Sequence, residues 1–571
     1  MREKWIILRK GADFKKIAAE FHINPVLARL IRNRNVIGTD NIEAYLNGTL
    51  DLLHDGMLMK DMDRATEILA EKIREGSKIR IIGDYDIDGV NATYILMQGI
   101  GGLGGNVDSD IPDRMKDGYG LNQELINRAI DCDIDTIVTC DNGIAALKEI
   151  EYAKRMGITV VVTDHHEVPF EEEEGMRRYI IPCADAVVDP KRQDCDYPFK
   201  GICGAGVAFK LVEALYNMFG KDVEDIDYLM ENVAIATIGD VMDLVDENRI
   251  FVKQGLEMLK RTNNLGLKAL MECTKIPVER LSAYHIGFIM GPCINAGGRL
   301  DTAKRALDLL CAATPKEADL LAGDLKALND SRKDMTLAGV KAAVEQIEST
   351  QLKTQKIIVV YLPECHESLA GIIAGRIRET YQKPCFVLTK AENCVKGSGR
   401  SIEAYDMFVE LTKCKQLLVK FGGHKMAAGL SLEEQQVEPF RKLINEVTTL
   451  VEEDFIPKVS IDMQLPLGYL NEELITELEV LEPYGKGNQK PIFVEKDLKI
   501  ISTKILGKNQ NVLKLQIKDA HGTVMAGVYF GDINEFLNYT KQKDTFAFTY
   551  YPGINEYMGQ KSLQIVVQNY Q

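Results

Sequence analysis

Three apolar segments of this chain end where a cluster of aspartates and histidines begins. The segments are Lys78–Gly83, Asp135–Cys140 and Ile158–Thr163, and they lead into Asp84-Tyr-Asp-Ile-Asp-Gly89, Asp141-Asn-Gly143 and Asp164-His-His166. In an open parallel sheet, ligands collect beyond the carboxyl ends of the strands. Carboxylates and imidazoles gathered there would repel one another unless bound cations held them. The pattern therefore predicts a site for two divalent metal ions, and with it hydrolysis at phosphorus.

The candidate metal ligands share the hard oxygen chemistry of such a site. They are Asp84, Asp86, Asp88, Asp141, His165 and Asp240. Asp84, Asp86 and Asp88 are spaced two residues apart, so in an extended segment their side chains would share one face. Carboxylates suit Mg²⁺ and Mn²⁺, and an added imidazole moves the preference toward Mn²⁺. Two such ions can activate a shared water and clamp phosphate oxygens.

Taken singly, each part of this pattern has an ordinary structural explanation. An aspartate followed by glycine at the end of a strand is usually a turn, and a pair of histidines is usually an exposed loop. The metal interpretation depends on three clusters that each follow a segment of buried-strand composition. The 12 cysteines form no CxxC pair, which argues against a structural zinc site.

A second set of residues could hold a phosphate ester beside the metals. Asn295-Ala-Gly-Gly-Arg299 combines small residues with an arginine that could bind phosphate through two N–H groups. The structural alternative for Arg299 is an ion pair with Asp301.

Two glycine-rich segments further along the chain could add contacts to the substrate. Ser398 and Arg400 lie in the first, and Gly423 and His424 lie in the second. Backbone N–H groups in such segments can bind phosphate oxygens, although plain turns are the alternative. Between residues 383 and 426 there are eight Lys and Arg against four Asp and Glu. This acidic chain is therefore locally basic where a nucleic-acid strand would lie.

The elements that must position these residues alternate between strand and helix, which predicts an α/β multidomain protein with a parallel sheet. A segment rich in Ala, Leu, Lys and Glu then predicts a long connector helix, and short β-branched segments near the end predict a small β-barrel. We expect five regions, namely an N-terminal helical segment (1–60), a catalytic domain (61–311), the connector (312–350), a second α/β domain (351–455) and the barrel (456–571).

Composition limits the class of protein. The net charge of −16 disfavours a protein that coats nucleic acid over its whole surface. No apolar run is long enough for a membrane span, and the first residues lack the apolar core of a signal peptide. We therefore expect a cytoplasmic protein with reduced cysteines.

These motifs resemble the DHH phosphoesterase superfamily, and within it the single-strand-specific DNA exonucleases. The resemblance covers nearly the whole chain and includes four further segments, which are Ile111–Asn122, Gly291–Arg299, Gly422–Gly429 and Leu481–Asn488. It implies a DHH domain, a connector helix, a DHH-associated domain and an OB-fold. It also implies release of mononucleotides from the 5′ end of single-stranded DNA in repair and recombination. A single-strand-binding protein and a RecQ-type helicase are implied as partners only by the resemblance. We expect a monomer, although nothing in the sequence fixes the oligomeric state.

The resemblance also assigns roles to single residues. Asp86 would serve one metal, Asp88, His165 and Asp240 the other, and Asp141 would bridge them. Asp84 would lie in the same cluster, bound to a metal or supporting a ligand. By the same resemblance, His166 would face the phosphate of the scissile link. The sequence departs from the family pattern around Asp240, where Gly239 and Asp243 replace an expected alanine and proline.

Two other functions remain open at this point. The first is a DHH enzyme for cyclic dinucleotides or short oligoribonucleotides, although such enzymes resemble only the two central domains. The second is a non-catalytic DNA-binding scaffold, which loss of ligand residues would mark. Gly99–Gly104 matches GxGxxG literally, but it follows a helix and not a strand, so it fails the dinucleotide-binding test.

Overall fold

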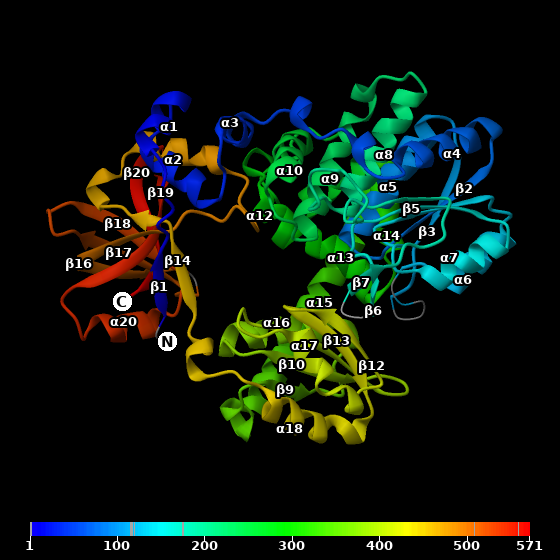
Figure 1. Cartoon of the computed structure of the whole chain (residues 1–571). Coiled ribbons are helices and arrows are strands. Elements are labelled where there is room, and N and C mark those ends of the chain that lie inside the picture. The colour runs from blue at the N-terminus through cyan, green and yellow to red at the C-terminus, as the bar shows by residue number, and fades with distance from the viewer. Residues whose placement is uncertain (1–2, 115–117, 119, 174–175, 508, 558) are drawn as a thin grey trace.

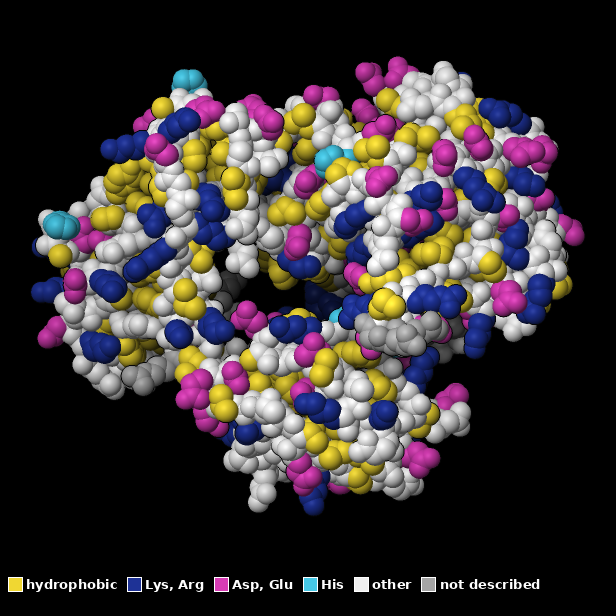
Figure 2. Space-filling view, in the orientation of Figure 1, with side chains coloured by type: hydrophobic (Ala, Val, Ile, Leu, Met, Phe, Trp, Pro, Cys, Tyr) yellow, Lys and Arg dark blue, Asp and Glu magenta, His cyan; other side chains and the backbone are white. Residues whose placement is uncertain are grey.

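The computed structural model describes residues 3–114, 118, 120–173, 176–507, 509–557 and 559–571. The chain folds into three lobes joined into a ring (Figure 1). Figure 2 shows an opening at the centre, with lysine and arginine side chains at its rim. Residues 115–117 and 119 of the segment 111–122 lie outside the described residues. None of the described helices is long and apolar enough to cross a bilayer.

The first lobe contains a five-stranded parallel sheet in the order β3-β2-β4-β5-β8. Its strands are β2 (Lys78–Gly83), β3 (Asn106–Asp110), β4 (Thr136–Cys140), β5 (Thr159–Thr163) and β8 (Ala186–Val188). The central strands are almost wholly buried, as expected of strands covered by helices on both faces. The three predicted strands are therefore present and adjacent, and the expected parallel sheet is confirmed.

Two groups of helices cover the faces of this sheet. One core contains α4 (Met62–Glu75), α5 (Ile87–Gly102) and α8 (Gly204–Met218), and the other contains α6 (Gln123–Asp131) and α7 (Leu147–Arg155). Outside the sheet lie the hairpin of β6 (Phe170–Glu173) and β7 (Met176–Tyr179) and the helices α9 (Met230–Gly239), α10 (Asp246–Leu259), α11 (Leu265–Cys273), α12 (Ala283–His285), α13 (Gly291–Leu300) and α14 (Lys304–Leu310).

One prediction about this lobe was wrong in detail. The segment Asp84–Asp88 is not extended, because Asp86 caps the N-terminus of α5 and Asp88 lies in its first turn. The same helix runs to Gly102, so most of Gly99–Gly104 is helical and only its end forms a loop.

The predicted connector is α15 (Pro315–Ser349), a helix of 35 residues and about 52 Å at 1.5 Å per residue. It leads to the second lobe, where a five-stranded sheet has the order β12-β13-β11-β10-β9. The strands are β9 (Ile358–Tyr361), β10 (Cys385–Lys390), β11 (Val395–Arg400), β12 (Lys420–His424) and β13 (Ala427–Leu432), and the helices are α16 (Ala370–Tyr381), α17 (Met407–Thr412) and α18 (Val437–Val447).

The third lobe is built on strands whose pairing closes into a ring, because β16 pairs with β17 on one side and with β19 on the other. Its elements are β14 (Lys458–Ile461), β15 (Met463–Gln464), α19 (Glu472–Leu478), β16 (Phe493–Leu506), β17 (Val512–Lys518), β18 (Val524–Tyr529), α20 (Ile533–Thr540), β19 (Phe546–Tyr557) and β20 (Gln560–Tyr570).

The N-terminal segment belongs to this third lobe in space. β1 (Lys4–Ile7) pairs with β14, and α2 (Pro25–Asn33) and α3 (Thr39–Asn47) share a core with the strands of the ring, whereas α1 (Phe14–Phe21) lies at its edge. The two ends of the chain therefore meet in one lobe (Figure 1). The boundaries given above for the five regions stay predictions.

Candidate active site

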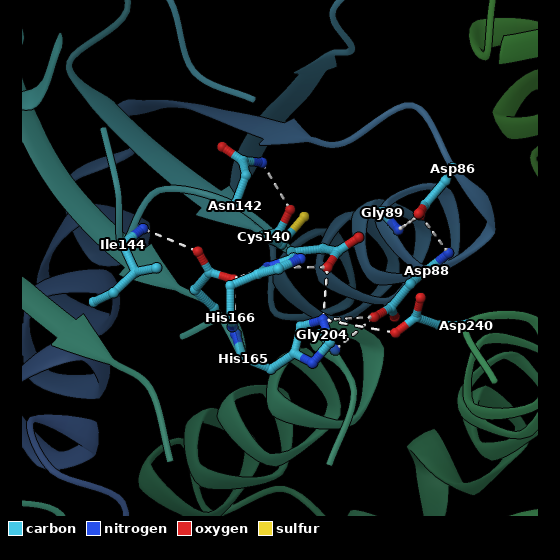
Figure 3. A network of polar contacts seen from close by, with 12 residues as sticks. Asp86, Asp88, Gly89, Cys140, Asn142, Ile144, His165, His166, Gly204 and Asp240 are labelled. Carbon is cyan, nitrogen blue, oxygen red and sulfur yellow. Dashed lines mark hydrogen bonds and ion pairs between the residues drawn. The ribbon is translucent and has the colours of Figure 1, made fainter. Parts of the chain in front are cut away.

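The candidate ligands converge at the carboxyl ends of β2, β4 and β5. Figure 3 shows three of them, Asp88, His165 and Asp240, close together. Asp141 follows β4 with a φ of 58°, a left-handed conformation that few residues other than glycine adopt. Gly143, with a φ of 117°, completes this turn, and a Cβ there would collide with Thr139. The tight turn directs the Asp141 carboxylate back over the end of the sheet.

His165 lies at the centre of the cluster. Its Nε2 is 3.0 Å from an Asp141 oxygen, 3.4 Å from an Asp88 oxygen and 3.9 Å from an Asp240 oxygen. Ligand atoms of Asp88, His165 and Asp240 lie within 4.8 Å of one another, and those of Asp84, Asp86 and Asp141 do the same. The structure thus brings all six predicted ligands together, and a third group of Asp141, His165 and His166 overlaps both.

Backbone N–H groups fix two of the carboxylates in place. Asp88 accepts hydrogen bonds of 2.7 Å from both Gly204 and Ala205 at the start of α8. Asp86 accepts from the N–H groups of Asp88 and Gly89 at 2.9 and 3.1 Å. Helix N-termini favour negative charge, so these N–H groups stabilise the ionised carboxylates. The N–H groups carry no full positive charge, so the negative charge of each carboxylate remains.

The electrostatics of the cluster fit a cationic occupant. Burial, followed by the charge of Asp86, raises the pKa of Asp88 to about 6, and burial together with the charge of Asp88 raises the pKa of Asp240 to about 8. Burial also raises the pKa of Asp84 and of Asp141. One buried oxygen of Asp84 accepts no hydrogen bond from any described residue. Oxygen-rich donors that repel one another are the set that Mg²⁺ and Mn²⁺ bind.

The two adjacent histidines have opposite properties. Burial lowers the pKa of His165 to about 3, which keeps its imidazole neutral and able to bind a metal. For His166, burial acts in the same direction, but a 2.7 Å hydrogen bond to Asp164 outweighs it and raises the pKa to about 9. His166 is therefore a cation beside the cluster, and its half-exposed ring is open to a substrate.

A basic cleft of about 480 Å³ opens between this site and the second lobe. Arg299, Ser398 and Arg400, three of the predicted substrate-binding residues, line it. Arg299 donates to the Ser368 carbonyl at 3.1 Å, whereas Asp301 pairs with Arg305, so the alternative ion pair for Arg299 does not form. A Cβ on Gly298 would collide with the Tyr85 carbonyl, which explains why glycine precedes Arg299 at this close approach.

Three predicted substrate contacts lie elsewhere. The Asn295 side chain accepts a 2.9 Å hydrogen bond from the Ile87 N–H, so it positions the first turn of α5. Gly423 and His424 are exposed on the edge strand β12 and are not among the described residues that line the cleft, although Gly422 is.

The comparisons with known proteins agree along the whole chain. Residues 78–237 match the DHH family N-terminal domain, residues 354–449 the DHHA1 domain and residues 461–569 the RecJ OB domain. The chain is 33% identical to the single-stranded-DNA-specific exonuclease RecJ of Bacillus subtilis, over 99% of this chain and 70% of that protein. It is 32% identical to RecJ of Escherichia coli, over 95% of both. The chain belongs to the RecJ family.

Solved structures of RecJ proteins place the same architecture around metal ions. RecJ of Thermus thermophilus in complex with Mn²⁺ covers 100% of this chain and 79% of its own, with 27% identity and a TM-score of 0.84. A manganese-bound exonuclease RecJ covers 71% of this chain and 97% of its own, with 31% identity and a TM-score of 0.60. The RecJ fold, including the OB domain, therefore accounts for the whole chain.

Sequence reasoning missed several residues of this RecJ site. Arg114 lines the basic cleft and lies over the Tyr85 ring at 5.1 Å. It stands in the segment 111–122 that carried the family resemblance, so it could have been chosen. Asp164, which holds His166, and Gly204, which holds Asp88, were harder to find, because their roles depend on hydrogen bonds that only the fold reveals.

Proposed function

We propose that this chain is a metal-dependent exonuclease that degrades single-stranded DNA from the 5′ end to mononucleotides, in DNA repair and recombination. The observation that carries the proposal is the convergence of six candidate metal ligands, together with a basic cleft lined by Arg299, in a chain that belongs to the RecJ family. The cofactors would be two Mn²⁺ or Mg²⁺ ions, the ions named in the solved Thermus thermophilus RecJ complexes.

The grouping of ligand atoms supports a division of labour among the residues. Asp86 would hold one ion, with Asp84 beside it, and Asp88, His165 and Asp240 would hold the other. Asp141 belongs both to the group with Asp84 and Asp86 and to a group with His165, which lies 3.0 Å away, so it would bridge the ions. When bound, such a pair of ions supplies a water of lowered pKa and neutralises charge on the phosphate.

The remaining residues would act on the phosphate directly. Arg299 would hold phosphate oxygens with its guanidinium, and Arg400 and Ser398 would bind the terminal nucleotide from the second lobe. His166, protonated below a pKa of about 9, would donate a hydrogen bond to an oxygen on which charge develops. Charged donors in such a half-buried site are stronger than in water.

The cellular setting belongs to the same proposal. A monomer in the cytoplasm would act on single strands that a RecQ-type helicase unwinds and a single-strand-binding protein coats. The central opening would admit one strand and exclude a duplex.

End-labelled single-stranded DNA tests the proposal. A 5′ label should appear at once in mononucleotides, a 3′ label should stay in long products until late, and a chelator should stop both. A blunt duplex should stay intact. Release of the 3′ label first would contradict the polarity, and preferred hydrolysis of dinucleotides would favour the small-substrate alternative.

A further inference from the structure

The N-terminal part of this acidic chain is locally basic. Residues 9–35 carry seven Lys and Arg against two Asp and Glu, although the whole chain has a net charge of −16. They form α1 and α2, which Figure 1 shows at the outer end of the third lobe, away from the central opening. None of these residues, all of which are described, lines the basic cleft beside the metal site. A surface with one sign of charge attracts ligands of the opposite sign.

One of the seven cations has a structural role. Arg34 donates to the side chain of Asn488 and to the Gln489 carbonyl, and it lies 3.6 Å from Asp462. The other six form what we call the N-terminal basic surface, which consists of Arg9, Lys10, Lys15, Lys16, Arg29 and Arg32. None of the six forms an ion pair with a carboxylate of a described residue.

Two contacts hold residues 9–16 against α2. The Arg32 Nε donates to the Gly11 carbonyl at 3.2 Å. The guanidinium of Arg29 lies 5.7 Å from the centroid of the Phe14 ring in the first turn of α1. The cations that precede and begin α1 and those of α2 therefore lie on one surface.

The cations of this surface repel one another and have only neutral partners. Lys10 donates to the Asn33 carbonyl at 2.6 Å, and burial, followed by the charge of Arg32, lowers the pKa of Lys10. Lys15 and Lys16 are exposed, because the apolar residues of α1 pack toward the core of the lobe. A polyanion laid across these side chains would relieve the repulsion.

The composition of the surface decides which kind of polyanion it fits. Within residues 9–35, a range that is described throughout, no large apolar side chain is exposed. The core of a specific protein–protein interface is depleted of charge and more apolar than the rest of the surface. Nucleic-acid backbones are bound mainly by Lys and Arg and by polar groups. The surface therefore fits a chain of phosphates better than an acidic protein.

We propose that the N-terminal basic surface binds the phosphate backbone of DNA that lies outside the ring of lobes. The inference rests on the proposed function for the identity of the polyanion. Such contacts position nucleic acid without reading its sequence. Because the surface lies away from the central opening, DNA that is too short to leave the ring would not reach it.

The test is the salt dependence with which a long unstructured DNA strand binds, measured with a chelator present so that hydrolysis plays no part. Each phosphate contact to a single strand contributes about 0.7 to the slope of log K against log salt. The triple variant Arg9→Gln, Lys15→Gln, Lys16→Gln should lower this slope by about 2, which weakens binding about 100-fold at about 0.1 M salt and little near 1 M. The charge-retaining variant Arg9→Lys, Lys15→Arg, Lys16→Arg should keep the wild-type slope.

A second triple variant controls for total charge. Lys341→Gln, Lys353→Gln and Lys442→Gln remove the same number of positive charges at exposed positions that already pair with glutamates. This variant should change the slope by less than about 0.5. Equal slopes for the two glutamine variants, or a wild-type slope for the first of them, would overturn the inference.

Two further substrates locate the contact on the DNA. A strand of about 6 nucleotides, near the lower end of single-strand site sizes, should bind wild type and the first glutamine variant equally. A loss there as large as with the long strand would also overturn the inference, because so short a strand stays within the ring. With a duplex that carries a short 5′ tail, a similar loss would assign the surface to the duplex, and no loss would assign it to the single strand.

The proposed function fails on a different observation. Absence of hydrolysis by wild-type protein with Mn²⁺ would refute it. The salt slopes measured without metal would still decide whether the N-terminal basic surface binds DNA.

Discussion

Two buried polar regions of this molecule treat charge in opposite ways. In the metal site, carboxylates face one another and their pKa values rise because burial and mutual repulsion disfavour the charged forms. At the junction of the first and third lobes, Arg249 is 3% exposed, yet it donates to the carbonyls of Tyr45, Val480 and Leu481. At the junction, the hydrogen bonds of the buried arginine are supplied by the chain itself. In the metal site, the negative charge of the carboxylates needs a bound cation, which the chain does not supply.

The buried side chain of Asn488, at the same junction, has hydrogen-bond partners for both its oxygen and its nitrogen. Its oxygen accepts from Arg34 and from the Tyr45 hydroxyl, each at 2.8 Å, and its nitrogen donates to the carbonyls of Leu481 and Pro483. A fully satisfied buried network specifies one arrangement of the lobes. A cluster of buried carboxylates that repel one another costs stability in the metal-free protein, and relief of this cost raises the affinity of the cluster for cations.

The largest expected effect comes from Asp141→Asn. We expect hydrolysis of single-stranded DNA to fall about 1,000-fold, or about 4 kcal/mol in the barrier, because the proposed bridge is lost. The metal-free variant should be at least as stable as wild type, since a buried carboxylate with a raised pKa has been removed. Activity assays and thermal unfolding check both points. Asp63→Asn, on the exposed face of α4, is the control, and wild-type activity in Asp141→Asn would refute the site.

The junction should respond in the opposite way. Arg249→Met leaves buried carbonyls without donors, so the free energy of unfolding should fall by about 3 kcal/mol. Hydrolysis of a dinucleotide should change little, because Arg249 lies outside the metal site. Denaturant unfolding and dinucleotide assays measure the two quantities. Arg376→Met, at an exposed arginine paired with Glu379, should change neither, and equal stability of both variants would mean that the junction contributes little.

The next largest effect concerns how the stability of the metal-free protein depends on pH. A carboxylate whose folded-state pKa is raised binds more protons in the native state, so the stability of the metal-free protein falls as pH rises above the unfolded value. For Asp88 and Asp240, with pKa values of about 6 and about 8, this loss develops between pH 4 and pH 8. We expect acidification from pH 8 to pH 6 to stabilise the metal-free protein by about 2 kcal/mol.

Calorimetric or fluorescence melting with and without Mn²⁺ checks this expectation. The gain from Mn²⁺ should be larger at pH 8 than at pH 6, because protons compete with the metal for the same oxygens. Asp240→Asn should reduce the dependence on pH. A gain from Mn²⁺ that stays constant over this range would contradict the assigned direction of the pKa shifts.

The sequence predicted the metal region better than the junction, and the reason is physical. Strand ends that carry Asp141 or His165 follow a local rule, because the carboxyl ends of parallel strands meet at one edge. The contacts of Arg249 join residues more than 200 positions apart and follow no periodicity. The segment Leu481–Asn488 carried family resemblance, but nothing in its composition indicated that it fastens two lobes.

Errors within the site came from local backbone geometry. The alternation of Asp84, Asp86 and Asp88 suggested a strand, but Asp86 is a favoured helix cap and could have predicted the start of α5. The ion pair of Arg299 with Asp301 was only the alternative to phosphate binding, and it does not form. Asp301 follows the last residue of α13 and pairs with Arg305 of α14 instead.

The smallest expected effect concerns His166, a cation at the edge of the metal region. Its pKa of about 9 lies above the unfolded value, so its stabilising contribution is complete below about pH 6.5 and is lost as pH rises through 9. The ring is 44% exposed, so solvent screening reduces the contribution to about 1 kcal/mol.

His166→Gln removes this titration but leaves Asp164 held by the N–H of Ile144. In metal-free protein, the stability difference between wild type and the variant should be largest at pH 6 and should shrink toward pH 9. A difference that does not vary with pH would mean that Asp164 does not hold His166 in its charged form.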